Sequence, residues 1–208
     1  MKVSILGHGV VGKGVFDMLE SCPDHSICHV LVRSGHADSQ RSYMVDSIEK
    51  ILDDESNLVI ECMGGETPAF EYARRCLEAG KSIITANKAL VAAHGLELAS
   101  LAKRKGLAFL FSAACGGSIP ILQNIFLARQ TDRILWAGGI LNGTTNFILD
   151  AMDKRSLSFE QALKEAQSLG YAESDPTADI TGLDTLRKIL LASMVVFDLL
   201  PESGFDVE

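Results

Sequence analysis

The chain has 208 residues, of which 47% are hydrophobic and 22% are charged, and its formal net charge is −8 at pH 7. This composition fits a globular protein with a sizeable core and excludes a disordered chain. The acidic balance, with no block of lysine or arginine, disfavours nucleic acid or an anionic membrane surface as a partner. No apolar run approaches the roughly 20 residues of a membrane span, and the first residues lack the pattern of a signal peptide.

The cysteines are odd in number and show no spacing typical of a metal site. Each lies in or near an apolar run, which indicates free thiols inside a core. Free thiols persist in a reducing compartment, so we expect a cytoplasmic protein. The five are Cys22, Cys28, Cys62, Cys76 and Cys115.

A glycine motif, Gly7-His8-Gly9-Val10-Val11-Gly12, follows the first predicted strand, Lys2–Leu6, and opens a helical pattern. A strand, such a motif and a helix together form a dinucleotide-binding turn, in which the helix N-terminus donates N–H groups to a pyrophosphate. The alternative is a glycine-rich turn that serves only helix–strand packing. The expected cofactor contacts in the motif are Gly7, Gly9, Val10, Val11 and Gly12.

The second predicted strand, Ile27–Val32, ends at Arg33. A site that prefers NAD usually carries an acidic residue at this position, which binds the ribose hydroxyls. A guanidinium here can instead pair with the 2′-phosphate of NADP. We therefore expect NADP, or both NADP and NAD, as the cofactor. A solvated surface arginine is the alternative.

Further strands are expected at 58–62, 82–85 and 108–111, and they alternate with helices, one of them at about 91–104. This alternation predicts an α/β fold with a doubly wound parallel sheet of the Rossmann type. Thr85, Asn87 and Lys88 lie at the carboxyl end of a strand, where ligands bind in such sheets. We expect them to contact the cofactor or substrate. A helix-leading loop with a solvated lysine is the alternative.

A second unit is expected to begin after the helix at 121–129, with a strand over Arg133–Leu141 and then several helices. The sequence thus predicts an NAD(P)-binding domain over residues 1–125. An α+β domain for substrate binding, catalysis and dimerisation would span residues 126–208.

An acid–lysine cluster lies near the start of the last predicted helix. Asp184 and Lys188 are four residues apart and share one helix face, and Glu173, Asp175 and Asp179 precede them. Such a lysine can hand a proton to a developing alkoxide, and carboxylates this dense would bind a substrate ammonium group. The residues alone fit equally well an ordinary i,i+4 salt bridge near a helix N-terminus.

The chain resembles homoserine dehydrogenase over nearly its whole length. The motifs that carry the resemblance are GHGVVG (7–12), ECMGGETPA (61–69), AGKSIITANKALVA (79–92), GILNGTTNFIL (139–149) and EAQSLGYAESDPTADITGLDTLRK (165–188). The resemblance implies reduction of L-aspartate 4-semialdehyde to L-homoserine with NADPH or NADH, on the route to threonine, methionine and isoleucine. It implies Lys88 and Lys188 as catalytic residues, and Glu173 and Asp184 as substrate-binding carboxylates.

The resemblance further implies a sodium ion, held mostly on backbone carbonyls by Cys115, Gly117, Ile119, Gly170 and Glu173. The family usually has Glu where this chain has Ser112, so one sodium contact differs.

The family also continues beyond residue 208, so we expect the second domain to be incomplete. Apolar positions of the last helix would then need cover, which favours a homodimer. These positions are Leu190, Val195, Val196, Leu199 and Leu200.

Two other functions remain open. The chain could bind NAD(P) without catalysis, as a truncated relative that cannot close on its substrate. It could also act on an acyl phosphate through a cysteine nucleophile, for which Cys115 in its glycine loop is the candidate. No histidine lies near Cys115 in sequence to activate it.

Overall fold

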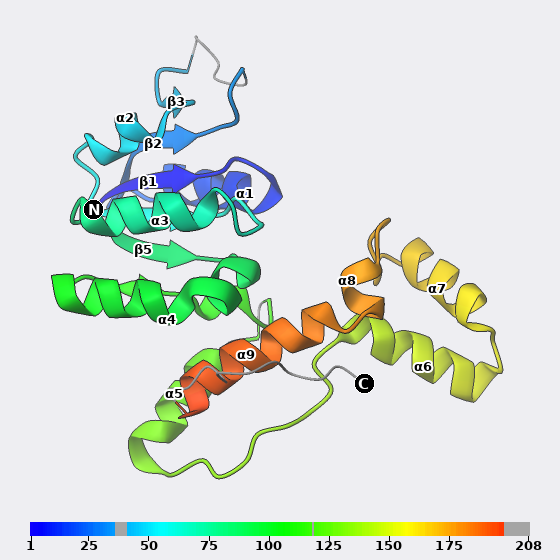
Figure 1. The fold of residues 1–208 in the computed structure, drawn as a ribbon. Coiled ribbons are helices and arrows are strands. Elements are labelled where there is room, and N and C mark those ends of the chain that lie inside the picture. The colour runs from blue at the N-terminus through cyan, green and yellow to red at the C-terminus, as the bar shows by residue number, and fades with distance from the viewer. Residues whose placement is uncertain (36–40, 118, 198–208) are drawn as a thin grey trace. The chain divides into compact units, whose positions relative to one another are not determined.

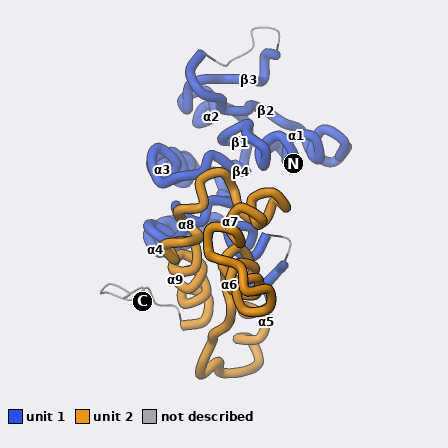
Figure 2. The backbone as a smooth tube through the Cα atoms, turned by 90° about the vertical axis from the view of Figure 1, so that its right-hand side faces the viewer, with its two compact units in different colours: residues 1–124 blue, residues 125–208 orange. Residues whose placement is uncertain are grey.

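The computed structural model describes residues 1–35, 41–117 and 119–197 (Figure 1). The chain divides into two compact units, Met1–Asn124 and Ile125–Glu208 (Figure 2). Each unit has its own cluster of buried apolar side chains. Among the described helices, none is both long enough and apolar enough to cross a bilayer.

The first unit is built on a six-stranded sheet with the order β3-β2-β1-β4-β5-β6, in which every neighbouring pair is parallel. The order runs outward in both directions from β1, so the predicted doubly wound sheet is confirmed. The strands are β1 (Lys2–Leu6), β2 (Ser26–Leu31), β3 (Met44–Val45), β4 (Leu58–Glu61), β5 (Ser82–Thr85) and β6 (Phe109–Leu110). The helices are α1 (Val10–Glu20), α2 (Ile48–Leu52), α3 (Ala69–Glu78) and α4 (Lys88–Lys105), with a 3-10 turn η1 at Ser112–Ala114.

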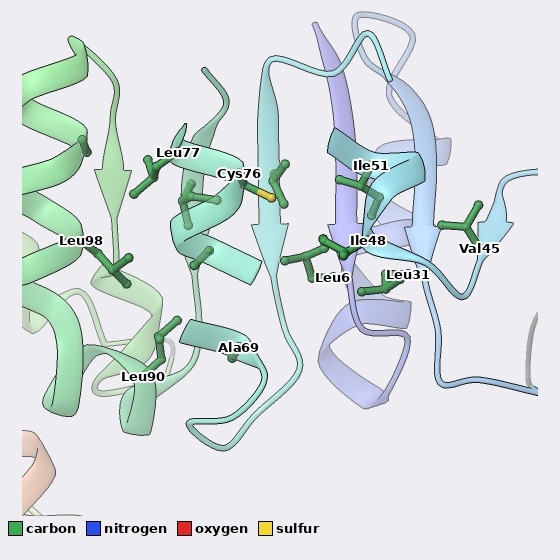
Figure 3. Packing of buried hydrophobic residues seen from close by; sticks show 14 residues of the cluster. Leu6, Leu31, Val45, Ile48, Ile51, Ala69, Cys76, Leu77, Leu90 and Leu98 are labelled. Atoms are coloured by element: carbon green, nitrogen blue, oxygen red, sulfur yellow. The ribbon is translucent and has the colours of Figure 1, made fainter. Parts of the chain in front are cut away.

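Helices cover both faces of this sheet because successive strand residues point to opposite sides. Ile5 belongs to a cluster with Phe16 of α1. Its neighbour Leu6 belongs to the larger cluster on the other face, which includes Ile51 of α2 and Leu77 of α3 (Figure 3). Burial on both faces explains why these strands consist of continuous apolar runs.

Helix α4 begins earlier than its apolar pattern indicated. Asn87 caps it, because the Asn87 side chain accepts a hydrogen bond from Leu90 N at 3.1 Å. Lys88 is therefore the first residue of the helix rather than part of a preceding loop. The helix ends as expected at Gly106, which adopts a left-handed conformation with φ of 67°.

The second unit is helical in its described part. Its helices are α6 (Gly143–Arg155), α7 (Phe159–Ser168), α8 (Thr177–Ile180) and α9 (Leu183–Phe197), and α5 (Ile121–Thr131) spans the boundary between the units. A core forms where α6 packs against α7, around Ile148 and Ala162. The short helix α8 was not predicted.

The predicted strand over Arg133–Leu141 is wrong, since the structure assigns this segment no strand. A strand requires a partner that accepts and donates its backbone hydrogen bonds, and no strand forms in the described part of the second unit. Leu135 and Trp136 are each 78% exposed there. An apolar run predicts a strand only where a neighbouring strand exists.

The apolar positions of α9 are partly covered within the chain. Val196 is buried, and Leu190 and Val195 are half-buried. Leu199 and Leu200, which were also expected to need cover, lie outside the described residues.

Candidate functional site

A pocket of about 880 Å³ in the first unit lies at the carboxyl ends of β1, β2 and β4. This is the edge where ligands bind in a doubly wound sheet. Of the predicted cofactor contacts, Gly7, Gly9 and Arg33 line it. The other lining residues are His8, Leu31, Val32, Ser34, Arg41, Met44, Asp46, Cys62, Met63, Gly64, Thr67, Pro68 and Tyr72.

The three motif glycines have different roles. Gly7 has φ of +96°, and a Cβ on Gly12 would lie 2.0 Å from the Gly7 carbonyl oxygen, so both are required for the turn and its packing. A Cβ on Gly9 would meet nothing within 4 Å. Packing therefore accounts for the first and third glycines but not for Gly9, whose open side faces the pocket.

The start of α1 offers backbone donors beside this pocket. The first hydrogen bond of this helix joins Lys13 N to Gly9 O at 2.8 Å. The helix's own hydrogen bonds therefore do not use the N–H groups of Val10, Val11 and Gly12. The Val10 side chain is 94% exposed. These donors suit an anionic group at the helix N-terminus.

The side-chain charges of the pocket are mainly positive. Arg33 and Arg41 both line it, and Asp46 carries the one formal negative charge among the described residues that line it. Arg33 was singled out from its place after β2, whereas nothing in the sequence pattern indicated Arg41. Two guanidiniums suit a phosphate group, because each offers several N–H donors in one plane.

Cys62 lines the same pocket as a neutral thiol. Burial, assisted by the nearby charge of Glu61, raises the pKa of the Cys62 thiol to about 11. Cys62 therefore adds no negative charge to this pocket near neutral pH.

Thr85, Asn87 and Lys88 do not line the pocket. Thr85 and Asn87 are buried, and their polar atoms bond to protein groups around Glu61. Lys88 is half-buried at the start of α4. Their roles as cofactor or catalytic contacts stay predictions.

A second pocket, of about 520 Å³, lies entirely within the second unit. Asp184 and Lys188, both predicted as site residues, line it. Its other lining residues are Asn142, Gly143, Thr144, Asn146, Phe147, Asp150, Tyr171 and Asp179. Several of these residues belong to the motif GILNGTTNFIL (139–149), which carries the resemblance.

Lys188 lies against two acceptors. Its Nζ donates to Leu141 O at 2.6 Å and to Asp184 Oδ2 at 2.7 Å. The expected i,i+4 salt bridge is therefore present, and both of its members also face a pocket. The side chains are only 15% exposed for Asp184 and 19% for Lys188, so water screens the pair weakly.

Asn142 joins the acidic residues of this pocket. Its side-chain oxygen caps α6 by accepting from Thr145 N at 2.8 Å. Its Nδ2 donates to Asp179 Oδ1 at 2.7 Å and to Asp184 Oδ2 at 2.9 Å. One buried amide thus holds two carboxylates near the lysine.

Glu173 does not line this pocket in the structure, although it precedes the same helix. It is exposed, and its backbone carbonyl accepts from Gln167 Nε2 at 3.1 Å. Asp175 is also exposed, and its carboxylate bonds to the backbone and hydroxyl of Thr177, which holds the pKa of Asp175 below its usual range. Asp179 is the carboxylate of this loop that reaches the pocket.

The sodium ligands implied by the resemblance are divided between the units. Ile119 O accepts from Ile121 N at 2.8 Å, and a carbonyl that accepts one hydrogen bond retains a second lone pair for a cation. Gly170, with φ of 78°, ends α7 in the second unit. In the described residues no group of His, Cys, Asp and Glu side chains could hold a metal. Cys115, another of the implied ligands, is buried. A sodium site built from backbone carbonyls remains a prediction.

Lys88 belongs to the first unit and Lys188 to the second. Each is described within its own unit, so the convergence of their amines on one substrate stays a prediction.

Two family models match the chain. The NAD-binding domain of homoserine dehydrogenase matches residues 7–112, and the homoserine dehydrogenase domain matches residues 120–204. The homoserine dehydrogenase of Pseudomonas aeruginosa is 36% identical over 96% of this chain and 49% of its own length.

Solved structures agree with these matches. A homoserine dehydrogenase from Thiobacillus denitrificans has a TM-score of 0.84 and 36% identity, and the alignment covers 96% of this chain and 49% of that one. A hyperthermophilic archaeal homoserine dehydrogenase in complex with NADPH shares the fold, with a TM-score of 0.82 and 23% identity over 97% of this chain and 71% of that one.

The chain spans about half the length of the curated relatives that it matches. The first match lies within the unit that holds the larger pocket, and the second match covers most of the unit that holds the acid–lysine cluster. The chain belongs to the homoserine dehydrogenase family.

Proposed function

We propose that this protein catalyses the NAD(P)H-dependent reduction of L-aspartate 4-semialdehyde to L-homoserine, a step toward threonine, methionine and isoleucine. The observation that carries the proposal is the pocket in which Lys188, Asp184, Asn142 and Asp179 are joined by hydrogen bonds. A lysine beside carboxylates can serve both ends of a substrate that has an aldehyde and an ammonium group.

Lys188 has the role of general acid. An ammonium group has three N–H donors, and two acceptors among the described residues lie within hydrogen-bond distance of Lys188 Nζ. One donor therefore remains for the substrate's aldehyde oxygen. When the carbonyl carbon is reduced, Lys188 would transfer its proton to the developing alkoxide. Lys88 would help to orient or polarise the same oxygen.

The carboxylates have the role of holding the substrate ammonium. Asp184 and Asp179 supply negative charge in the pocket, and Glu173 would contribute as the resemblance implies. Charge-assisted hydrogen bonds of this kind contribute more than neutral ones. Because Asn142 donates to both aspartates, it fixes the site where the ammonium would bind.

The first-unit pocket fits a nicotinamide dinucleotide, which when bound would supply the hydride. Its exposed helix N-terminus and open Gly9 suit the pyrophosphate. We propose that Arg33 binds the 2′-phosphate of NADP, with NAD as the second cofactor. The archaeal homoserine dehydrogenase with the same fold was solved with NADPH.

The decisive experiment measures the loss of reduced nicotinamide absorbance when the 208-residue chain is mixed with NADPH and L-aspartate 4-semialdehyde. Consumption of NADPH that requires the aldehyde, with homoserine as product, supports the proposal. The competing function is NAD(P) binding without catalysis. It predicts NADPH binding with no aldehyde-dependent oxidation.

We also propose a homodimer, a sodium site and a cytoplasmic location. The dimer proposal rests on exposed apolar side chains of the second unit, including Phe126, Leu135 and Trp136. Light scattering during size exclusion measures the mass directly. Activity in sodium compared with potassium buffers tests the sodium site.

A further inference from the structure

A buried polar cluster lies at the carboxyl ends of β4 and β5. Glu61 and Thr85, the last residues of the two strands, are both 0% exposed. Thr85 Oγ1 donates to Glu61 Oε2 at 2.5 Å and accepts from Asn87 N at 2.9 Å. The Glu61 carboxylate also accepts from Met63 N at 2.8 Å and from Asn87 Nδ2 at 3.4 Å.

This cluster holds a loop that lines the cofactor pocket. Met63 and Gly64 both line the pocket. Gly64 and Gly65 have φ of +74° and +72°, and a Cβ on either would meet nothing within 4 Å. Met63 packs against the larger core cluster, but Gly64 and Gly65 have no side chains to hold the rest of the loop. Two side chains hold its backbone instead: Met63 N donates to Glu61, and Asn87 Nδ2 donates to Gly65 O at 2.5 Å.

The same cluster also fixes the start of α4. Asn87 donates through Nδ2 to Glu61 and to Gly65 O, while its Oδ1 caps α4 at Leu90 N. Lys88 is the next residue in the chain and the first of the helix. Glu61 therefore bonds directly to the pocket loop. Through Asn87 it also supports the start of the helix whose first residue is Lys88, a proposed catalytic lysine.

A second polar cluster, before the amino ends of β4 and β5, provides a contrast. Asp54 there accepts from Ser4 Oγ at 2.7 Å and forms an ion pair with Lys81 at 2.9 Å. Ser4 also accepts from His29 N at 3.2 Å. This cluster also centres on a carboxylate with little exposure, 5% for the Asp54 side chain, although Asp54 has a lysine partner and Glu61 accepts from neutral donors. None of its members lines the cofactor pocket.

We infer that Glu61 is a positioning residue for the nicotinamide dinucleotide: its carboxylate fixes the 63–65 backbone in the pocket and the α4 start that carries Lys88. This inference rests on the proposed function. Glu61 is fully buried, so it acts through the groups it binds and not by touching the ligand. An acceptor-only side chain is required, because Met63 N and Thr85 Oγ1 both donate to it.

Two matched pairs of variants separate positioning from stability. Glu61→Gln and Asp54→Asn each convert a buried carboxylate to a carboxamide, one at each end of the sheet. Thr85→Val and Ser4→Ala each remove a buried hydroxyl that donates to that carboxylate and accepts one backbone N–H. The second pair keeps the test usable if Asp54→Asn does not fold.

NADPH dissociation constants are measured by fluorescence titration well below the melting temperature of each variant. We expect Glu61→Gln and Thr85→Val to raise the NADPH dissociation constant about tenfold, the factor of one lost hydrogen bond of about 1.4 kcal/mol. Asp54→Asn and Ser4→Ala lower the melting temperature and leave the constant unchanged. An unchanged constant in Glu61→Gln, or an equal rise in all four variants, overturns the inference.

Amide hydrogen exchange gives a second readout that needs no ligand. We expect Glu61→Gln to lose protection at Met63 N and Leu90 N while the β1 core keeps it. Failure of the unsubstituted chain to bind NADPH would overturn the proposed function alone. If the unsubstituted chain does not bind NADPH, hydrogen exchange still tests the inference. Retained protection at Met63 N in Glu61→Gln would then overturn it, and lost protection would show that Glu61 fixes the loop.

Discussion

The two pockets of this chain differ in charge and in the way they are built. The pocket of the first unit is formed by loops at one edge of a sheet, with Arg33 and Arg41 among its lining residues. The pocket of the second unit is formed largely by helices, and its lining residues include three aspartates, Asp150, Asp179 and Asp184, together with Lys188.

The difference matches the ligand that we propose for each pocket. Phosphates are recognised by backbone N–H groups at a helix start together with guanidiniums. An amino-acid aldehyde needs carboxylates for its ammonium and one proton donor for its oxygen. Substitutions in one pocket should therefore leave the property measured at the other unchanged.

The largest effect is expected from Lys188→Met. Removal of the general acid should lower turnover by roughly 10²–10⁴-fold, while the NADPH dissociation constant stays the same because Lys188 does not line the first-unit pocket. Steady-state kinetics and NADPH titration measure the two quantities. Lys164→Met, at an exposed position of α7, is the matched control. Turnover close to that of the control would remove Lys188 from the acid role.

The next largest effect is expected from Arg33→Ala. Loss of a charge-assisted bond to the 2′-phosphate should weaken NADPH binding by about tenfold or more and leave NADH binding nearly unchanged. The KM for the aldehyde should not move. Titration with both cofactors gives the ratio, and Arg41→Ala shows whether the second guanidinium contributes. An unaltered ratio in Arg33→Ala would make this arginine a surface residue only.

A smaller effect is expected from Asp179→Asn. The hydrogen bond from Asn142 can persist, so only the charge near the ammonium is lost, and the KM for the aldehyde should rise roughly fivefold. Glu173→Gln provides the comparison, because Glu173 is exposed and outside the pocket. An equal rise there would support the role that the resemblance assigns to Glu173. A constant KM in Asp179→Asn would argue against a role for this pocket in substrate binding.

The smallest effect concerns Cys62 and its pH dependence. Because the pKa of Cys62 is raised to about 11, roughly one thiol in a thousand is ionised at pH 8. Alkylation by iodoacetamide should be slow at that pH and should accelerate as the pH approaches 11. NADPH should slow it further, since Cys62 lines the pocket. Mass spectrometry of the Cys62 peptide follows the rate, with glutathione as the reference thiol.

Local pattern was sufficient for the dinucleotide turn. Gly7, Gly9 and Gly12 are close in sequence, and their separate roles follow from one strand, one turn and one helix. The same holds for Asp184 and Lys188, which a single turn of α9 brings together. Such features depend on spacing along the chain and little on the rest of the fold.

Pattern failed where a feature needed a distant partner. The segment Arg133–Leu141 has the composition of a strand, but the described chain offers it no neighbour to pair with. Thr85 and Asn87 lie at the expected edge of the sheet, yet their polar atoms bond to buried protein groups. Position at a strand end does not by itself decide whether a side chain faces a ligand.

The sequence by itself determined the alternation of strands and helices in the first unit, the parallel sheet and the glycine turn, because apolar periodicity and glycine geometry act over a few residues. The tertiary structure alone decided that Asn142 joins Asp179 and Asp184, and that Glu61 and Thr85 meet beneath the pocket loop. These pairs lie 24 to 42 residues apart along the chain. Only the packing of whole elements brings such groups within hydrogen-bond distance, because no short-range pattern encodes a contact between them.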